Sequence, residues 1–277
     1  MILRLIDEKI RRAFSDAAMQ YDILAGLHQE IGRELLAKAA GGPLKAAGTE
    51  SVDAVLDVGM GTGWLTGRLK NYFPDARVVG LDAADGMIEA ARCRQEEFHI
   101  VQADAGRLPF HGGRFDLVIS NLAYQWMSDL FLAFGECHRV LRDDGKLCMT
   151  MFGYHTFREL FDALAKTRED GSGLAIVRPA LGEASLRRLA GKEEIAAALN
   201  KAGFRDARVE EETVRTHFPD MLALVKWIKD IGANALMNNM FIGRDWLAKA
   251  SAYYSRTFPD RWGVCATFEV IWVQARK

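Results

Sequence analysis

Several features that would define other classes of protein are scarce or missing in this sequence. Its 277 residues include four cysteines, at positions 93, 137, 148 and 265, and no Cys-x-x-Cys pair, so neither a zinc site nor a disulfide framework is predicted. No apolar run approaches the roughly 20 residues that a membrane-spanning helix needs, and charges follow closely on the first apolar residues, which argues against a secretion signal. A formal net charge of −1 lacks the positive excess of a nucleic-acid binder. We therefore expect a cytoplasmic protein with reduced thiols, without a metal, a membrane or a nucleic acid as partner.

The composition is that of a globular protein, with 49% hydrophobic and 26% charged residues. Its length suits one large domain carrying a cap. From Asp7 to Ala37 apolar residues recur every three or four positions, as in an amphipathic helix, until Gly41-Gly42-Pro43 breaks the pattern. We expect a helical N-terminal lid over residues 1–45 and a catalytic domain over residues 46–277, with a helical cap inserted at roughly 154–192.

Short apolar runs alternate with helical segments between about residues 52 and 152. The runs 54–58, 77–81 and 115–121 are apolar on both faces, which is typical of central parallel strands covered by helices on each side. The pattern predicts an α/β fold with a Rossmann-like, doubly wound sheet. The other strands are expected at 98–102, 146–152, 207–218 and 266–275, and helices at 64–72, 86–92, 130–140 and 193–201.

A glycine-rich turn connects the first strand to the helix that follows it. Gly59, Gly61 and Gly63 allow backbone conformations and close ligand approaches that other residues forbid, and the helix start offers free N–H groups. Dinucleotide-binding loops begin in a similar way. Here, however, the spacing is Gly-x-Gly-x-Gly, and Asp57 precedes the turn, where a carboxylate would repel a pyrophosphate and attract an ammonium group. The turn therefore predicts S-adenosylmethionine as the cofactor.

Two further carboxylates end the next two strands. Asp82, with its neighbour Ala83, is placed to accept hydrogen bonds from both ribose hydroxyls; alone, it would equally suit a solvated turn. Asp104 is expected to bind the adenine amino group, with a backbone contribution from Ala105. Met87 is a candidate to pack on the adenine ring or, alternatively, to fill the core.

Together these segments resemble class I methyltransferases over about a hundred residues. The resemblance is carried by Asp57 to Gly63, Gly80-Leu-Asp82, Gly86-Met87, Ala103-Asp104, Leu108-Pro109-Phe110 and Phe115 to Asn121. It implies a sheet of seven strands, mostly parallel, whose last strand is antiparallel.

The loop after the fourth strand is rich in hydrogen-bonding and aromatic side chains. It runs Ser120-Asn-Leu-Ala-Tyr-Gln-Trp126, at the sheet edge where open α/β folds bind substrates. Alternatively, Tyr124 and Trp126 seal the top of the sheet. The segment resembles the malonyl-acyl-carrier-protein O-methyltransferases of biotin synthesis, and so do residues 10–22, 152–160, 228–234 and 267–271.

This second resemblance implies methylation of the free carboxylate of malonyl on acyl-carrier protein. A carboxylate is ionised at neutral pH, since its reference pKa is about 4, so donors that position it are expected rather than a base. The resemblance places Tyr21 in the lid facing the methyl group. Gln125, Asn121 and His155 are further candidates, with Asn121 also at the cofactor; His155 equally suits an exposed loop.

Because acyl-carrier protein is acidic, we expect a basic surface around the mouth of the site to bind it. Arg187, Arg188 and Lys192 form one cluster, and Lys226 and Lys229 another; each cluster equally suits a solvated helix face. No spacing in the sequence identifies the cationic side chain that binds the acceptor carboxylate. Arg244 is one candidate.

Three alternatives remain open from the sequence. Malonyl could be presented on coenzyme A instead of acyl-carrier protein. The acceptor could be another metabolite, such as a trans-aconitate-like acid or a quinone precursor. The chain could also be a methyltransferase-like assembly factor or a hydroxylase relative, because fold and cofactor binding do not establish turnover.

Overall fold

The fold is built on one mixed sheet. The structure, a computed structural model, describes residues 2–41, 52–168, 189–233 and 243–277. Within them the strand order is β3-β2-β1-β4-β5-β8-β6, with β7 paired to β8. The strands are β1 (Ala54–Val58), β2 (Arg77–Asp82), β3 (His99–Gln102), β4 (Phe115–Asn121), β5 (Leu141–Phe152), β6 (Arg205–Phe218), β7 (Pro259–Asp260) and β8 (Gly263–Arg276).

The predicted Rossmann-like sheet is confirmed. The first five strands pair in parallel, whereas β8 is antiparallel to both β5 and β6. Seven strands were expected, and the described residues contain an eighth, the two-residue β7, which forms a short hairpin with the start of β8. So short a strand carries no alternating pattern from which it could be predicted.

Helices cover both faces of the sheet, which explains why its central strands are apolar throughout. On one face α2 (Gly26–Gly41) and α3 (Trp64–Tyr72) bury Leu35 and Leu69 against Val55. On the other face α5 (Leu130–Val140) and α8 (Lys192–Lys201) pack Phe134 and Leu199 in a second cluster. All five residues of β1 are buried. The strand therefore holds Asp57 inside the protein, at the start of the glycine turn.

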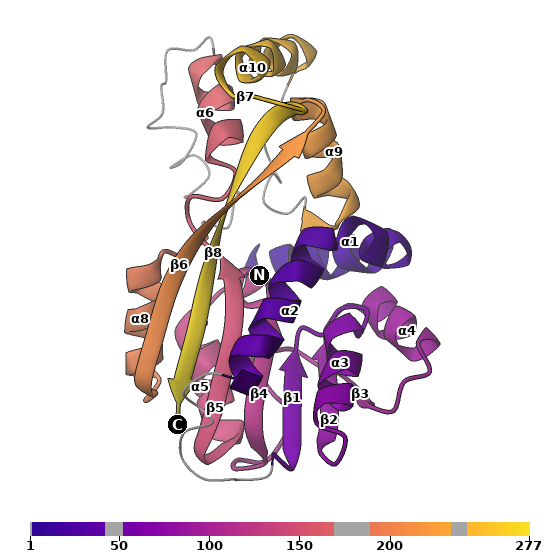
Figure 1. Cartoon of the computed structure of the whole chain (residues 1–277), viewed down its shortest axis with the longest axis vertical. Helices are drawn as coiled ribbons and strands as arrows, with labels where there is room; N and C mark the ends of the chain where they lie inside the picture. Colours follow the sequence, from indigo (N-terminus) through magenta and orange to yellow (C-terminus); the bar gives the residue numbers. More distant parts are fainter. Residues whose placement is uncertain (1, 42–51, 169–188, 234–242) are drawn as a thin grey trace.

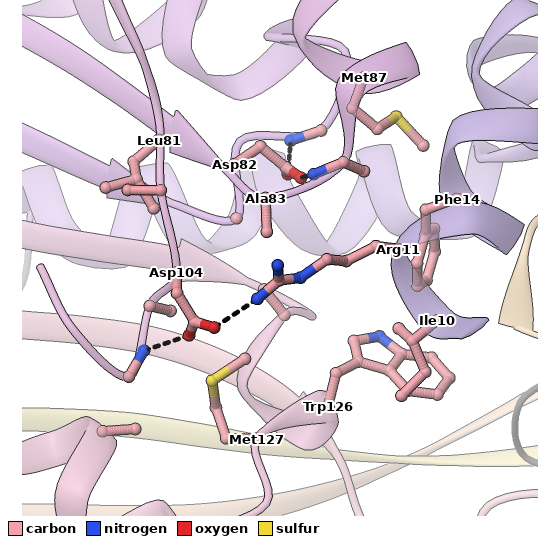
Figure 2. Close-up of a pocket in the computed structure, with 18 of the residues that line it drawn as sticks. Ile10, Arg11, Phe14, Leu81, Asp82, Ala83, Met87, Asp104, Trp126 and Met127 are labelled. Carbon is pink, nitrogen blue, oxygen red and sulfur yellow. Dashed lines mark hydrogen bonds and ion pairs between the residues drawn. The ribbon is translucent and has the colours of Figure 1, made fainter. Parts of the chain in front are cut away.

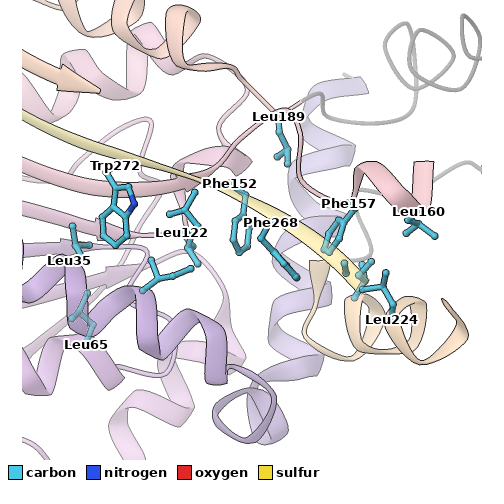
Figure 3. Packing of buried hydrophobic residues seen from close by; sticks show 14 of the residues in the cluster. Leu35, Leu65, Leu122, Phe152, Phe157, Leu160, Leu189, Leu224, Phe268 and Trp272 are labelled. Atoms are coloured by element: carbon cyan, nitrogen blue, oxygen red, sulfur yellow. The ribbon is translucent and has the colours of Figure 1, made fainter. Parts of the chain in front are cut away.

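A cap stands on the extended ends of β6 and β8 (Figure 1). The predicted insertion at 154–192 contributes α6 (Arg158–Lys166), while its residues 169–188 lie outside the described residues. Two helices from the connection between β6 and β8 complete the cap: α9 (Met221–Asp230) and α10 (Arg244–Thr257). Figure 3 shows one hydrophobic cluster running from α2 and α3 into this cap. Phe268 joins the two parts, with ring centroids 5.3 Å from Phe152 and 4.8 Å from Phe157.

The first helix, α1 (Ile2–Leu24), lies between the cap and α4 (Asp85–Cys93), as Figure 1 shows. The Gly86 N–H donates to Ser15 Oγ at 3.2 Å, and a Cβ at Gly86 would collide with the Ser15 carbonyl oxygen. Asp22, near the end of α1, accepts a hydrogen bond from Thr62 Oγ1 at 2.6 Å and pairs with Arg94. Because α2 packs on the sheet itself, α1 is the helix of the described residues 2–41 that lies over the strand ends.

Three observations bear on the classes of site considered from the sequence. No helix in the described part of the chain combines the length and apolar character that a membrane crossing requires. The described residues also contain no cluster of three or more His, Cys, Asp or Glu side chains arranged to hold a metal ion. All four cysteines are free thiols, and burial raises the pKa of Cys148 to about 12.

Candidate active site

A cavity of about 720 Å³ opens at the carboxyl edge of the parallel strands, beneath α1 (Figure 2). Strand ends, the glycine turn and the lid helix all contribute to its walls. It brings together nine of the residues predicted from the sequence, which are Tyr21, Gly59, Gly61, Asp82, Ala83, Met87, Asp104, Ala105 and Asn121. The distant segments that carried the prediction therefore meet in one site.

A second cavity of about 50 Å³ adjoins the first. Tyr21, Gly59, Gly61 and Asn121 line both, so the two cavities are neighbours on either side of these residues at the glycine turn. Asp57 lines the smaller one. Gly63 and Gln125 line neither of these two cavities.

The glycine turn requires glycine for two separate reasons. Gly59, Gly61 and Gly63 have φ values of 74°, 57° and 81°, in the left-handed region that side chains disfavour. At Gly59 a Cβ would also collide with the Cβ of Ala123, in the loop after β4. Gly63 precedes the first residue of α3 and so sets the start of that helix. The turn thus brings its backbone against the cavity while placing α3 behind it.

Asp57 is a buried carboxylate with unused hydrogen-bonding capacity. Its Oδ2 accepts a bond from Thr66 Oγ1 at 2.7 Å, whereas its Oδ1 is buried and has no partner among the described residues. Burial raises the pKa of Asp57 to about 7, and the charge of Asp82 adds to this effect, while the Thr66 hydrogen bond opposes it. A cationic group in the smaller cavity would satisfy Oδ1 and stabilise the ionised form.

Asp82 ties the glycine turn to α4. Its Oδ2 accepts a hydrogen bond from the Gly61 N–H and its Oδ1 one from the Ala84 N–H, both at 2.9 Å. Burial nevertheless raises the pKa of Asp82. A carboxylate has about four lone-pair sites, so these bonds fix its orientation and leave acceptor capacity toward the cavity. This arrangement suits a ligand with neighbouring hydroxyl groups.

Asp104 faces the same cavity and pairs with a residue that the sequence did not single out. Its Oδ2 lies 2.5 Å from Arg11 Nη2, and its Oδ1 accepts a hydrogen bond from the Gly106 N–H at 2.8 Å (Figure 2). Arg11 thereby links the lid helix to the end of β3. Phe14, one turn further along α1, packs edge-on against Trp126 with ring centroids 5.4 Å apart. These contacts close the cavity from the lid side.

The candidate donors differ in their surroundings. Burial and the charges of Asp82 and Asp22 raise the pKa of Tyr21, so its hydroxyl stays protonated. Asn121 uses its amide between two partners: Nδ2 donates to the His28 carbonyl at 2.9 Å, and Oδ1 accepts from Thr150 Oγ1 at 2.8 Å. Among the described residues the Tyr21 hydroxyl makes no hydrogen bond, and it belongs to a residue that lines both cavities, whereas the Asn121 amide is engaged.

The short helix η2 (Tyr124–Trp126) directs neighbouring side chains in different directions. Trp126 lines the large cavity. Tyr124 is fully buried, with its hydroxyl 2.7 Å from Cys137 Sγ and its ring stacked on Phe134, so it seals the core. Gln125 is 7% exposed, and its Oε1 has no partner in the described part of the chain.

The remaining candidates lie away from both cavities. His155 is exposed, and its backbone N–H donates to Glu269 at 3.0 Å. Arg244 is exposed at the start of α10, and Lys226 pairs with Asp230 on α9. Lys229 is exposed and Lys192 partly exposed, whereas Arg187 and Arg188 lie outside the described residues.

Arg11, Phe14 and His28 are among the cavity residues that were not predicted from the sequence. Phe14 and Tyr21 are seven residues apart on α1, which places them on one helical face, so the spacing was a usable signal for Phe14. His28 lies on α2, and its approach to the cavity depends on how the two helices meet. Nothing in the pattern distinguishes Arg11 from the adjacent Arg12, since both suit the solvated side of an amphipathic helix.

The fold and site define the class of the protein. A family described as methyltransferase domain matches residues 56–149. The YcgJ protein of Bacillus subtilis is similar in structure, with a TM-score of 0.58, 19% identity, and coverage of 86% of this chain and 97% of that one. With the glycine turn and the carboxylates at the ends of β1 and β2, these matches identify a class I S-adenosylmethionine-dependent methyltransferase.

Similarity to particular methyltransferases extends over nearly the whole chain. The malonyl-acyl-carrier-protein O-methyltransferase of Geobacter sulfurreducens is 35% identical over 270 residues, covering 95% of this chain and 96% of its own. The protein of the same name from Methylococcus capsulatus is 34% identical, covering 94% of this chain and 90% of its own. The chain belongs to the malonyl-acyl-carrier-protein O-methyltransferase family.

The residues of the site fit the family's cofactor. Asp57 Oδ1 is a buried acceptor that lacks a partner in the described structure, which suits an ammonium group. Asp82 is oriented toward the large cavity by two backbone bonds, and Met87, 2% exposed, forms part of its apolar wall. S-adenosylmethionine has an ammonium group, two ribose hydroxyls and an aromatic base, so its chemistry matches these three features.

Proposed function

We propose that this protein methylates the free carboxylate of malonyl-acyl-carrier protein in the early steps of biotin synthesis. The observation that carries the proposal is the 35% identity over 95% of the chain, because that span includes the lid and the cap as well as the cofactor-binding core. Acyl-carrier protein is the proposed partner, with coenzyme A as the alternative carrier. We place the enzyme in the cytoplasm, where four free thiols suit a reducing environment.

When bound, S-adenosylmethionine would supply a methyl group from its positively charged sulfur to a carboxylate oxygen, and it would leave as a neutral thioether because the electrons of the broken carbon–sulfur bond stay on sulfur. Since a carboxylate is ionised at neutral pH, no proton has to be removed. The protein's contribution is then to position the acceptor and exclude water.

The site residues divide between the two substrates. Asp57 holds the cofactor's ammonium group, and Asp82 with Ala83 holds the ribose. Asp104 and Ala105 recognise the adenine, and Met87 packs on it. On the acceptor side, Tyr21 donates a hydrogen bond to the carboxylate. Asn121 holds the neighbouring backbone in place, because its Nδ2 donates to the His28 carbonyl. Gln125 is a further candidate donor, although its side chain could reach the acceptor only if η2 moved.

The lid is the segment that we expect to control access. α1 covers the large cavity through Phe14 and Trp126 and through the Arg11–Asp104 pair. An edge-to-face aromatic contact contributes about 0.5 to 1.5 kcal/mol, and an exposed ion pair about 1 kcal/mol or less. Such contacts hold the lid closed and still allow it to open for the acceptor.

Replacing Tyr21 with phenylalanine tests the proposed donor. The ring contacts with Phe14 and His28 are retained, while the hydroxyl is lost. Because a hydrogen bond to a charged group contributes about 1.5 to 3 kcal/mol, kcat/KM for the malonyl substrate is expected to fall about tenfold to a hundredfold. Cofactor affinity, measured by calorimetry, should change less than about threefold. An unchanged kcat/KM would remove Tyr21 from the acceptor site.

The assignment of the acceptor is tested by products and by growth. Purified protein is incubated with S-adenosylmethionine and malonyl-acyl-carrier protein, malonyl-coenzyme A or free trans-aconitate, and methyl esters are detected by mass spectrometry. We expect the ester on the malonyl thioester and growth of a biotin-requiring strain that lacks its own methyltransferase. Methylation of the free acid alone would favour another acceptor. Cofactor binding with no methylated product would favour a non-catalytic relative.

A further inference from the structure

His28 contributes a buried polar atom that no residue of the site satisfies. Its Nδ1 is buried without a hydrogen-bond partner in the ranges that the structure describes, and so is Asp57 Oδ1. Both residues line the cavity of about 50 Å³ beside the glycine turn. A buried polar atom without a partner costs about 1 to 3 kcal/mol. Two such atoms on residues that line one small cavity therefore point to a ligand that carries partners for both.

The small cavity accommodates more than a single water molecule, which needs about 10 to 15 Å³. It shares Tyr21, Gly59, Gly61 and Asn121 with the large cavity. One ligand can therefore extend from the large cavity around the glycine turn, with a compact polar end in the small one. S-adenosylmethionine has this form, because its amino-acid end carries one ammonium and one carboxylate group.

The carboxylate of that end has few possible partners. The described residues that line the small cavity include no lysine and no arginine, and Arg94, behind the lining, is engaged by Asp22 and the Thr62 carbonyl. Thr62 Oγ1 already donates to Asp22, and Gln29 Nε2 to the Asp22 carbonyl. Asn121 Nδ2 donates to the His28 carbonyl. Three side-chain donors at the small cavity make no hydrogen bond among the described residues: the Tyr21 hydroxyl, the Trp64 indole N–H and His28 Nδ1. Of these, only His28 Nδ1 is fully buried, so it is the donor that most needs a partner.

His28 is held in a fixed position and in its neutral state. Its ring packs against Phe152, Tyr21 and Trp227, with centroid distances of 5.6, 6.0 and 6.0 Å. Burial lowers its pKa to about 4, so the ring is neutral at physiological pH. A neutral imidazole has one N–H group and one lone pair, and either nitrogen can carry the proton.

We propose that His28 is a cofactor-binding residue whose Nδ1–H donates to the methionine carboxylate of S-adenosylmethionine, while Asp57 Oδ1 accepts from the neighbouring ammonium group. The assignment rests on the proposed function, since it takes S-adenosylmethionine as the ligand. Because the ring of His28 also packs against Tyr21, the amino-acid end of the cofactor and the proposed acceptor donor share one wall. His28 thus determines specificity for a cofactor with an intact amino-acid end.

Two variants of similar size separate hydrogen bonding from packing. In His28→Asn the amide nitrogen occupies nearly the place of Nδ1, whereas His28→Leu offers no donor. Binding of S-adenosylhomocysteine and of methylthioadenosine, which lacks the amino-acid end, is measured by titration calorimetry. His28→Leu is expected to bind S-adenosylhomocysteine about tenfold to a hundredfold more weakly, and His28→Asn within about threefold of the unchanged protein. Both variants should bind methylthioadenosine as the unchanged protein does.

Decarboxylated S-adenosylmethionine identifies the group that His28 contacts. Because this analogue keeps the ammonium group, it should bind equally to His28→Leu and to the unchanged protein, and more weakly to Asp57→Asn. Weaker binding to His28→Leu would overturn the assignment to the carboxylate. Equal losses for methylthioadenosine and S-adenosylhomocysteine would instead show that the ring acts through packing. If the unchanged protein binds none of these ligands, the proposed function itself fails, a result distinct from either of the others.

Discussion

Asp57→Asn is expected to stabilise the ligand-free protein by about 2 to 4 kcal/mol at pH 8 and to weaken S-adenosylmethionine binding at least about tenfold. Both effects come from one buried carboxylate, whose Oδ1 has no partner among the residues that the structure describes. Ionised Asp57 is costly in the folded protein until a cation enters the small cavity. Asparagine removes the charge with little change in shape, so it removes both the cost and the attraction.

The direction of the pH dependence follows from the pKa. Burial raises the pKa of Asp57 from 3.8 to about 7, so between these values the folded protein binds more protons than the unfolded chain. The free energy of unfolding therefore falls as pH rises through this window. A pKa difference of about three corresponds to about 4 kcal/mol, fully expressed above pH 7 and absent below pH 4. The advantage of Asp57→Asn should grow over the same interval.

Chemical denaturation between pH 4 and 8 measures the first effect, and titration calorimetry measures the second. Asp116→Asn is the matched control: Asp116 Oδ2 accepts two backbone N–H bonds at 2.9 Å, and Oδ1 pairs with Arg142, so this substitution should destabilise the protein at pH 8. Calorimetry near pH 7 in buffers of different ionisation enthalpy should also detect proton release when the unchanged protein binds cofactor. A stability difference independent of pH would contradict the explanation.

The cofactor-binding residues were predictable because the topology of the sheet determines where the strand ends lie. Parallel strands bring their carboxyl ends to one edge, so residues at the ends of β1, β2 and β3 had to meet. Asp82 and Asp104 line the large cavity, and Asp57 lines the small one beside it. The central strands β1, β2 and β4 were predictable for a related reason: they are mostly buried, and buried parallel strands are apolar on both faces. The two-residue β7 has no pattern of its own.

The lid side depended on geometry that a sequence pattern does not contain. Arg11 reaches Asp104 only because α1 lies across the strand ends at one particular angle. His28 reaches the small cavity because α1 and α2 meet beside the glycine turn. In η2, Gln125 and Trp126 are neighbours in sequence, yet one is buried away from both cavities and the other lines the large one. A three-residue helix changes side-chain direction too abruptly for periodicity to predict.

Gly59→Ala is expected to lower the free energy of unfolding by about 2 to 5 kcal/mol. Its φ of 74° costs a residue with a Cβ about 1 to 2 kcal/mol. The new methyl group would also collide with Ala123, and overpacking of this kind costs about 1 to 3 kcal/mol. Both partners are backbone-anchored, one at the end of β1 and one after β4, so relief requires the glycine turn or the loop after β4 to move.

The same movement should weaken cofactor binding at least about tenfold, because Gly59 lines both cavities. Gly135→Ala in α5 is the control: in the described structure no heavy atom beyond its chain neighbours and its own helix backbone lies within 4 Å of an added Cβ, and alanine favours a helix by about 0.8 to 1 kcal/mol over glycine. Urea denaturation should therefore move the two midpoints in opposite directions, and calorimetry should find altered cofactor affinity for Gly59→Ala alone. If Gly59→Ala kept the stability of the unchanged protein and lost only binding, the glycine would be required by the ligand's approach and not by the contact between the two loops.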